Sequence, residues 1–266
     1  MLDFKFKDCY NCNDLVEIMR LLRAPGGCPW DAEQTHESIR KNLIEETYEV
    51  IEAINKQDSD LLCEELGDLL MQVVFHAQME SEAGRFDFDK VADGVCKKLI
   101  VRHPHVFGDA SVNGVDDVLS NWEEIKKKTK GQKTAGEAAQ NVPRELPALM
   151  RAAKIQKKAA DVGFDWPDIS GALDKLEEEI AELKEALNNN DKSEINEEFG
   201  DLLFSAVNVS RFLKLDAEES LTSASDKFLN RFIRVEEISG ERGINMNNSS
   251  IDILDKIWDE VKAESI

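Results

Sequence analysis

Acidic residues recur along this 266-residue chain in the pattern E-E-x-x-E, followed by E-E-x-G-D. In the second half of the chain the two patterns supply Glu179 and Glu182, then Glu198 and Asp201. Residues three or four apart share one face of a helix, so the members of each pair project together. Carboxylates that converge repel one another, and a divalent cation removes that repulsion. Because ligands made only of oxygen favour Mg²⁺, Mn²⁺ or Ca²⁺, the spacing predicts a site for a hard cation.

The first half of the chain carries the same acidic pattern at one constant offset, since 179 − 46 = 133 and 201 − 68 = 133. A single E-x-x-E pair is usually a solvated helix face. Two such motifs in the same order, duplicated without a gap, instead indicate an internal repeat with a second metal site. The predicted ligands of that second, weaker site are Glu46, Glu49, Glu65 and Asp68.

The elements that position these carboxylates read as amphipathic helices, with apolar residues recurring every three or four positions. A short Asn-rich connection at residues 188–191 predicts that the two helices of the second copy pack antiparallel. Gly67 and Gly200 lie inside the second acidic motif, where glycine costs roughly 1 kcal/mol against alanine, so we expect close helix approach there. No stretch shows sustained strand alternation. The predicted helices cover residues 42–54, 61–80, 172–187 and 195–213.

Asp and Glu outnumber Lys and Arg by 54 to 33, which gives a formal net charge of −21. This charge argues against nonspecific binding to nucleic acid, because phosphate backbones require a basic surface. No apolar run approaches the roughly 20 residues that span a bilayer, and the first residues lack the apolar core of a signal peptide. We therefore expect a cytoplasmic protein that binds neither nucleic acid nor membrane.

The five cysteines all lie in the first half of the chain. Their odd number favours reduced thiols over a disulfide framework. Cys9 and Cys12 form a lone C-x-x-C, and no second ligand pair stands at the spacing that a zinc site needs. The polar segment at residues 126–147, rich in Lys, Gly and Ala, reads as a linker. It separates an N-terminal domain at residues 1–125 from a C-terminal domain at residues 148–266.

Several motifs beyond the acidic patterns complete a family resemblance. Together with those patterns they closely resemble the MazG family of nucleoside triphosphate pyrophosphohydrolases, in its long two-domain form, over nearly the whole chain. The motifs are CPWDAEQTHESIRKNLIEETYEV at residues 28–50, RHPHVFGD at 102–109, VGFDW at 162–166 and KFLNRF at 227–232.

The resemblance implies an all-α fold of tandem MazG-like helical modules, each with a four-helix-bundle catalytic unit, in a homodimer. It implies Mg²⁺-dependent hydrolysis of NTP or dNTP to NMP or dNMP and pyrophosphate, with Mn²⁺ as a substitute. A carboxylate cluster cannot bind a triphosphate directly, so a bridging cation agrees with this chemistry. The resemblance further implies nucleotide contacts from Lys175, Lys227, Arg231 and Trp258, alongside the ligands Glu179 and Asp201. Glu178 is the candidate for positioning the attacking water.

The two copies differ at positions that would hold phosphate or base. Lys227 corresponds to Gly94, because 227 − 133 = 94, and Arg211 corresponds in the same way to Gln78. Because the N-terminal copy lacks these cations, we expect the C-terminal copy to be the main catalyst.

The C-terminal copy departs from the family pattern at one position. The family often places a Lys just before the second acidic motif, where this chain has Glu194.

Two other functions remain open at this point, and a third is disfavoured. One is a non-catalytic acidic helical module that regulates a partner protein. Another is a neighbouring enzyme of the dUTPase or phosphoribosyl-ATP pyrophosphohydrolase kind. A di-iron bundle is disfavoured, because it requires two E-x-x-H motifs and only Glu33 to His36 supplies one.

Overall fold

The computed structural model describes residues 4–130 and 134–264. The chain divides into two compact units, Met1–Thr129 and Lys130–Ile266. Every secondary-structure element among the described residues is helical, which confirms the predicted all-α class. The five cysteines are all free. No helix in the described ranges has both the length and the apolar character needed to cross a bilayer.

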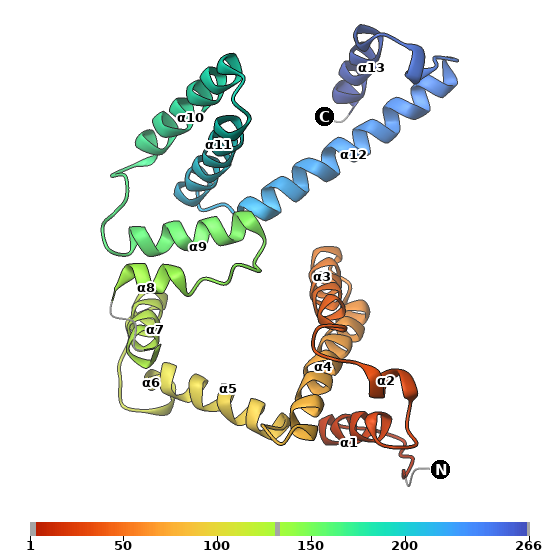
Figure 1. Cartoon of the computed structure of the whole chain (residues 1–266), viewed down its shortest axis with the longest axis vertical. Coiled ribbons are helices and arrows are strands. Elements are labelled where there is room, and N and C mark those ends of the chain that lie inside the picture. The colour runs from red at the N-terminus through yellow and green to blue at the C-terminus, as the bar shows by residue number, and fades with distance from the viewer. Residues whose placement is uncertain (1–3, 131–133, 265–266) are drawn as a thin grey trace. The chain divides into compact units, whose positions relative to one another are not determined.

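The first unit is built around a hairpin of two long helices, α3 (Arg40–Lys56) and α4 (Ser59–Glu82), which lie side by side in Figure 1. Its core brings α1 and the start of α3 against the second half of α4. The buried members of this core are Met19, Ile39, Val74, Phe75 and Met79. The remaining elements are α1 (Cys12–Arg23), α2 (Pro29–Glu33), α5 (Phe88–Arg102), α6 (Pro104–Phe107) and α7 (Val115–Lys130).

The second unit repeats the hairpin with α10 (Ile169–Asn189) and α11 (Lys192–Phe212). Figure 1 shows α12 (Ala217–Glu241) leaving the end of α11 and running away from the hairpin, with α13 (Ile251–Glu264) folded back beside it. The buried core between α12 and α13 consists of Val235, Ile238, Ile257 and Val261. The other elements are α8 (Ala135–Gln140), α9 (Ala148–Ala160) and a short 3₁₀ turn, η1 (Met246–Asn248).

The duplication extends to the turns that close the two hairpins. Gln57 and Asn190 both adopt the left-handed conformation, with φ of 55° and 57°, which ends the first helix of each pair. The following residue then caps the next helix, because the Asp58 carboxylate accepts from the backbone N–H of Asp60 and Leu61. Asp191 caps α11 in the same way. The positions agree with the offset of the repeat, since 190 − 57 = 133.

The segment predicted to be a linker is largely helical where the structure describes it. Helix α7 continues to Lys130, and α8 begins after Thr134. Thr134 and Glu137 form a capping box at the start of α8, and α8 packs against α9. Residues 131–133, within the predicted linker, lie outside the described residues.

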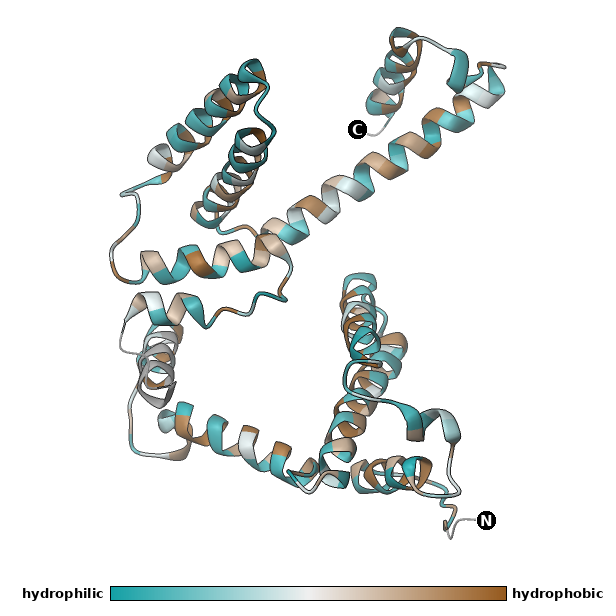
Figure 2. Cartoon of the chain, viewed as in Figure 1, coloured by the Kyte–Doolittle hydropathy of each residue, from teal (hydrophilic) through white to brown (hydrophobic). Residues whose placement is uncertain are grey.

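Both hairpins leave apolar side chains exposed on their faces. Figure 2 marks the hydrophobic positions along the ribbons of their helices in brown. The close approach expected at Gly67 and Gly200 is wrong within one chain, because a Cβ added at either position would meet nothing within 4 Å. The hairpins are therefore not fully packed by their own chain. Exposed members of these faces include Tyr48, Ile51, Leu66 and Leu70 in the first unit, and Ile180, Phe199 and Leu203 in the second.

Candidate metal centres

The C-terminal hairpin brings three of its predicted ligands together. One carboxylate oxygen each from Glu179, Glu182 and Glu198 lies within 4.8 Å of the others. Glu179 is buried, with only 4% of its surface exposed. Burial, and then repulsion from Glu182, raises the pKa of Glu198 above its ordinary value. This crowding of negative charge is what a divalent cation would relieve.

Lys175 supplies positive charge to this cluster from one turn earlier on α10. Its Nζ lies 2.7 Å from Glu178, 2.9 Å from Glu179 and 4.0 Å from Glu182. The hydrogen bond to Glu178, followed by that to Glu179, raises the pKa of Lys175 well above its ordinary value. The lysine therefore acts as the counter-ion of the acidic cluster.

The fourth predicted ligand, Asp201, is outside the group whose oxygens all lie within 4.8 Å of one another. Its charge still contributes to the raised pKa of Glu198. In the first unit Asp68 likewise stands outside the tight group and helps to raise the pKa of Glu46. Each aspartate thus lies at the margin of its cluster rather than at its centre.

The N-terminal hairpin forms a matching cluster from Glu46, Glu49 and Glu65, again with oxygens within 4.8 Å of one another. Burial is the main cause that raises the pKa of Glu46 and of Glu65. No lysine or arginine forms an ion pair with these three carboxylates in the described part of the chain. The counterpart of Lys175 is Asn42, because 175 − 133 = 42.

In the N-terminal cluster a neutral side chain, instead of a lysine, donates a hydrogen bond to one of the carboxylates. Gln72 Nε2 donates to Glu46 Oε1 at 3.4 Å, and this side chain was missed by the sequence reasoning. Its position one turn after Asp68, on the same face of α4, is the signal that could have revealed it. The two clusters thus share their carboxylates and differ in their counter-charge.

Both clusters suit a hard divalent cation. Each offers only carboxylate oxygens, which Mg²⁺ and Mn²⁺ prefer over the nitrogen and sulfur ligands of zinc sites. Burial is the main cause that raises the pKa of Glu182 and of Glu198, and neighbouring carboxylates add to it. The residues present therefore fit a divalent metal ion.

The remaining predicted nucleotide contacts lie on α12 and α13. Lys227 and Arg231 are four residues apart on α12, and neither has an ion-pair partner within the described ranges. Trp258 on α13 lies with its ring centroid 5.2 Å from that of Phe228. These two aromatic side chains and Phe232 help to line a cavity of about 280 Å³. Figure 1 shows α12 running away from the hairpin of α10 and α11 that carries the acidic cluster.

Arg211 makes contacts within its own unit. It forms an ion pair with Asp165 and donates to Asn208 Oδ1 at 2.8 Å. Its guanidinium also lies over the Phe212 ring, at 4.6 Å from the centroid. Arg211 therefore ties the VGFDW segment to the end of α11.

Comparison with known proteins agrees with the duplicated architecture. A model of the MazG nucleotide pyrophosphohydrolase domain matches residues 34–107 and 169–236, which contain both acidic clusters. The chain is 47% identical over 255 residues to the nucleoside triphosphate pyrophosphohydrolase of Escherichia coli K12, covering 95% of this chain and 97% of that relative. It is 48% identical over 249 residues to the nucleoside triphosphate pyrophosphohydrolase/pyrophosphatase MazG of Thermotoga maritima, covering 94% of each.

Proposed function

Because this chain belongs to the MazG family of nucleotide pyrophosphohydrolases, we propose that its C-terminal cluster hydrolyses NTPs and dNTPs to monophosphates and pyrophosphate with Mg²⁺. The chain is a hydrolase of nucleoside triphosphates, and family membership does not favour the non-catalytic alternative. The observation that carries the assignment to the second copy is the convergence of Glu179, Glu182 and Glu198 beside Lys175.

The metal ligands in this proposal are Glu179, Glu182, Glu198 and Asp201. Bound Mg²⁺ would neutralise these carboxylates and polarise the phosphoryl oxygens of the substrate. Glu178 lies beside the ligands and is 55% exposed, so it can reach a water molecule at the cluster. We propose that Glu178 is the base that accepts a proton from this water. For this, Lys175 must leave its ion pair with Glu178 and contact a phosphate of the substrate instead.

Cations on α12 complete the proposed site. Cleavage between the α and β phosphates leaves a strongly anionic pyrophosphate, which positive side chains must stabilise. Lys227 and Arg231 lie on one face of α12, and neither forms an ion pair with another residue of the described chain. Trp258, beside Phe228, offers a ring on which a base can stack.

A homodimer explains how these two groups of residues serve one substrate. The hairpins expose apolar faces, and Gly67 and Gly200 leave open space on them. Hairpins from two copies would bury these faces as a four-helix unit. In that arrangement α12 of one copy can reach the carboxylates of the other. We also propose that this enzyme acts in the cytoplasm.

The first copy is proposed to bind metal more weakly and to contribute little turnover. It retains Glu46, Glu49, Glu65 and Asp68 but has Gly94 where the second copy has Lys227. Metal binding requires only the carboxylates, whereas turnover also requires cations on the phosphates.

The test is product analysis with and without a chelator. Mixed dNTPs in Mg²⁺ should yield dNMP and pyrophosphate, and excess EDTA should abolish the reaction. Formation of dNDP and orthophosphate, or full activity in EDTA, would contradict the proposal.

A further inference from the structure

Two histidines of the first unit face each other outside the acidic clusters. His36, just before α3, places Nδ1 2.7 Å from Nδ1 of His76 on α4, and the two ring planes differ by only 3°. The ring centroids are 5.0 Å apart, and 5.0 − 2.7 = 2.3 Å is about the sum of the two centroid-to-nitrogen distances. The contact therefore runs along the line of the ring centres, and the rings are coplanar. Such a contact needs one N–H and one lone pair.

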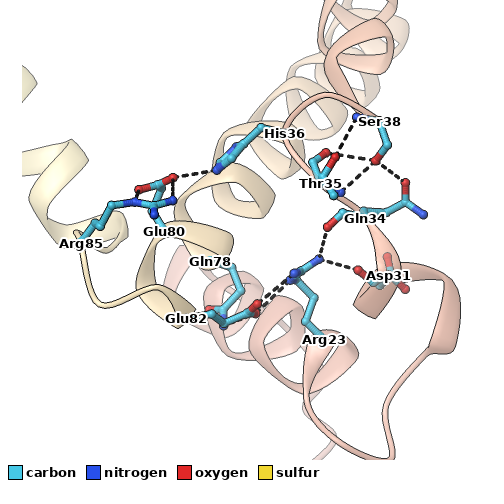
Figure 3. Close-up of polar contacts among 10 residues, drawn as sticks. All are labelled: Arg23, Asp31, Gln34, Thr35, His36, Ser38, Gln78, Glu80, Glu82 and Arg85. Carbon is cyan, nitrogen blue, oxygen red and sulfur yellow. Dashed lines mark hydrogen bonds and ion pairs between the residues drawn. The ribbon is translucent and has the colours of Figure 1, made fainter.

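The carboxylate of Glu80 fixes the proton on the far side of His36. The hydrogen bonds from Arg85, aided by His36, lower the pKa of Glu80 to about 2, so this carboxylate is ionised and accepts. His36 Nε2 donates to it at 2.7 Å. Figure 3 shows His36 and Arg85 on opposite sides of the Glu80 carboxylate. A neutral His36 therefore keeps its proton on Nε2 and presents the lone pair of Nδ1 to His76.

The number of protons on the two rings decides whether their contact can exist. In the neutral pair, His76 Nδ1 donates to the lone pair of His36 Nδ1. One added proton is compatible with the contact, because one of the two Nδ1 atoms still has a lone pair. A second added proton puts hydrogen on both Nδ1 atoms and positive charge on both rings, so the hydrogen bond is replaced by repulsion.

The surroundings of His76 also oppose its protonation. Its Nε2 is buried and has no hydrogen-bond partner in the described chain. Burial, and then the charge of His36, lowers the pKa of His76 below its ordinary value. The stability that depends on neutral His76 is therefore present above about pH 6.5, and it is lost as the pH falls through the lowered pKa of the folded unit.

The contact holds the segment that leads into α3 against α4. Arg23 holds the start of the same segment by donating to the backbone carbonyls of Asp31 and Gln34, as Figure 3 shows. Ile39, at the end of the segment, is buried in the core with residues of α4. A hollow of about 570 Å³ adjoins both histidines, which gives the rings room to separate. His36 is thus the titratable attachment of this segment.

The other charged groups around the pair keep their charge near neutral pH. Hydrogen bonds lower the pKa of each of the three carboxylates below its ordinary value, and guanidinium groups stay protonated. The residue that α5 contributes to the hollow is the apolar Val91. The charged groups on the elements that pack around the pair are Arg23 on α1, Glu37 and Arg40 at the start of α3, Glu80 and Glu82 on α4, and Arg85 after α4.

We propose that the contact between His36 and His76 is a pH-sensitive latch, which holds the entry of α3 against α4 and opens when both rings are protonated. The latch is specific to the first copy. The repeat offset places Ile169 and Val209 opposite the two histidines, because 169 − 36 = 133 and 209 − 76 = 133. Opening loosens the entry of the helix that carries two predicted ligands of the first metal cluster. The inference does not depend on the hydrolysis reaction.

Amide hydrogen exchange of the full-length protein at pH 7.5 and pH 5.5 tests the latch. Both values lie above the isoelectric point of about 4.6, so the protein keeps its negative charge. A histidine that stays neutral in the closed state and has a pKa of about 6.5 in the open state makes opening about tenfold more frequent at pH 5.5. Protection at residues 34–43, corrected for the intrinsic pH dependence of exchange, should therefore fall about tenfold. The counterpart segment at residues 167–176 should keep its protection.

Two variants and one control separate the latch from a general effect of acid. His36→Gln keeps an N–H donor for Glu80 but does not titrate, so protection at residues 34–43 should be equal at the two pH values. His76→Leu gives the same test if His36→Gln fails to fold. His103→Gln removes a histidine outside the pair and should keep the tenfold change. The proposal is overturned if the wild type shows no change, or if both latch variants lose protection as the wild type does. Either result leaves hydrolysis by the second copy unaffected.

Discussion

Exchanging the residues that distinguish the two acidic clusters should separate metal binding from turnover. Lys175→Asn gives the second copy the asparagine that the first copy has at the corresponding position, Asn42. The side chain of Lys175 is 37% exposed and makes two carboxylate contacts under 3 Å. The positive charge of Lys175 at these carboxylates opposes a cation at the cluster, so its loss should strengthen the binding of Mg²⁺ alone.

The magnitude follows from the exposure of the pair. Solvent screens these contacts, and an exposed ion pair contributes about 0.2–1 kcal/mol. Two such pairs correspond to a gain in Mg²⁺ affinity of about 2- to 30-fold. The rate of hydrolysis should nevertheless fall by about 10²- to 10³-fold, because one cation that stabilises the phosphates is gone. Tighter metal binding and slower turnover are thus expected together.

Titration calorimetry with MgCl₂ and pyrophosphate release measure the two effects. Lys175→Asn is compared in a Glu49→Gln background, which silences the first site. The matched control is Asn42→Lys in a Glu182→Gln background, where Mg²⁺ should bind more weakly and activity should not appear. Unchanged Mg²⁺ affinity together with wild-type turnover in Lys175→Asn would refute the reasoning.

Three further outcomes are expected. The stabilising effect of ionised Glu80 is present above pH 4.5 and lost as pH falls toward about 2; Arg85→Ala should therefore reduce stability at pH 6, with the difference disappearing towards pH 2 in circular dichroism melts. Gly171→Ala would place a Cβ 2.8 Å from the Trp166 ring; the ring must move outward, and unchanged tryptophan emission would contradict this. Lys227→Ala should slow hydrolysis about 10²- to 10³-fold while calorimetry shows Mg²⁺ binding unchanged.

The helices and the clusters could be predicted because both depend on local spacing. Glu179 and Glu182 face one way on any helix, and the constant offset repeated that spacing in the first half. The predicted all-α fold and the family are confirmed. The short connection before Asp191 predicted that α10 and α11 pack antiparallel. This packing places Glu198 close to Glu179 and Glu182.

Features that depend on distant parts of the chain were not predictable from spacing. His36 was noticed only as part of E-x-x-H, yet it contacts Glu80, which lies 44 residues away. The polar composition of residues 126–147 suggested a linker, although the capping box of Thr134 and Glu137 signalled the helix that forms there. The close approach expected at Gly200 was wrong, because a Cβ added there would meet nothing within 4 Å.

The division of labour between the two copies is tested most directly by removing one ligand from each. Glu182→Gln and Glu49→Gln replace counterpart residues, since 182 − 49 = 133, with side chains of nearly equal size. With a dNTP and Mg²⁺, and with folding checked by circular dichroism, Glu182→Gln should lower pyrophosphate release by about 10²-fold or more. Glu49→Gln should keep most of the wild-type rate. If Glu49→Gln is inactive while Glu182→Gln retains its activity, the first copy is the catalyst and the assignment is reversed.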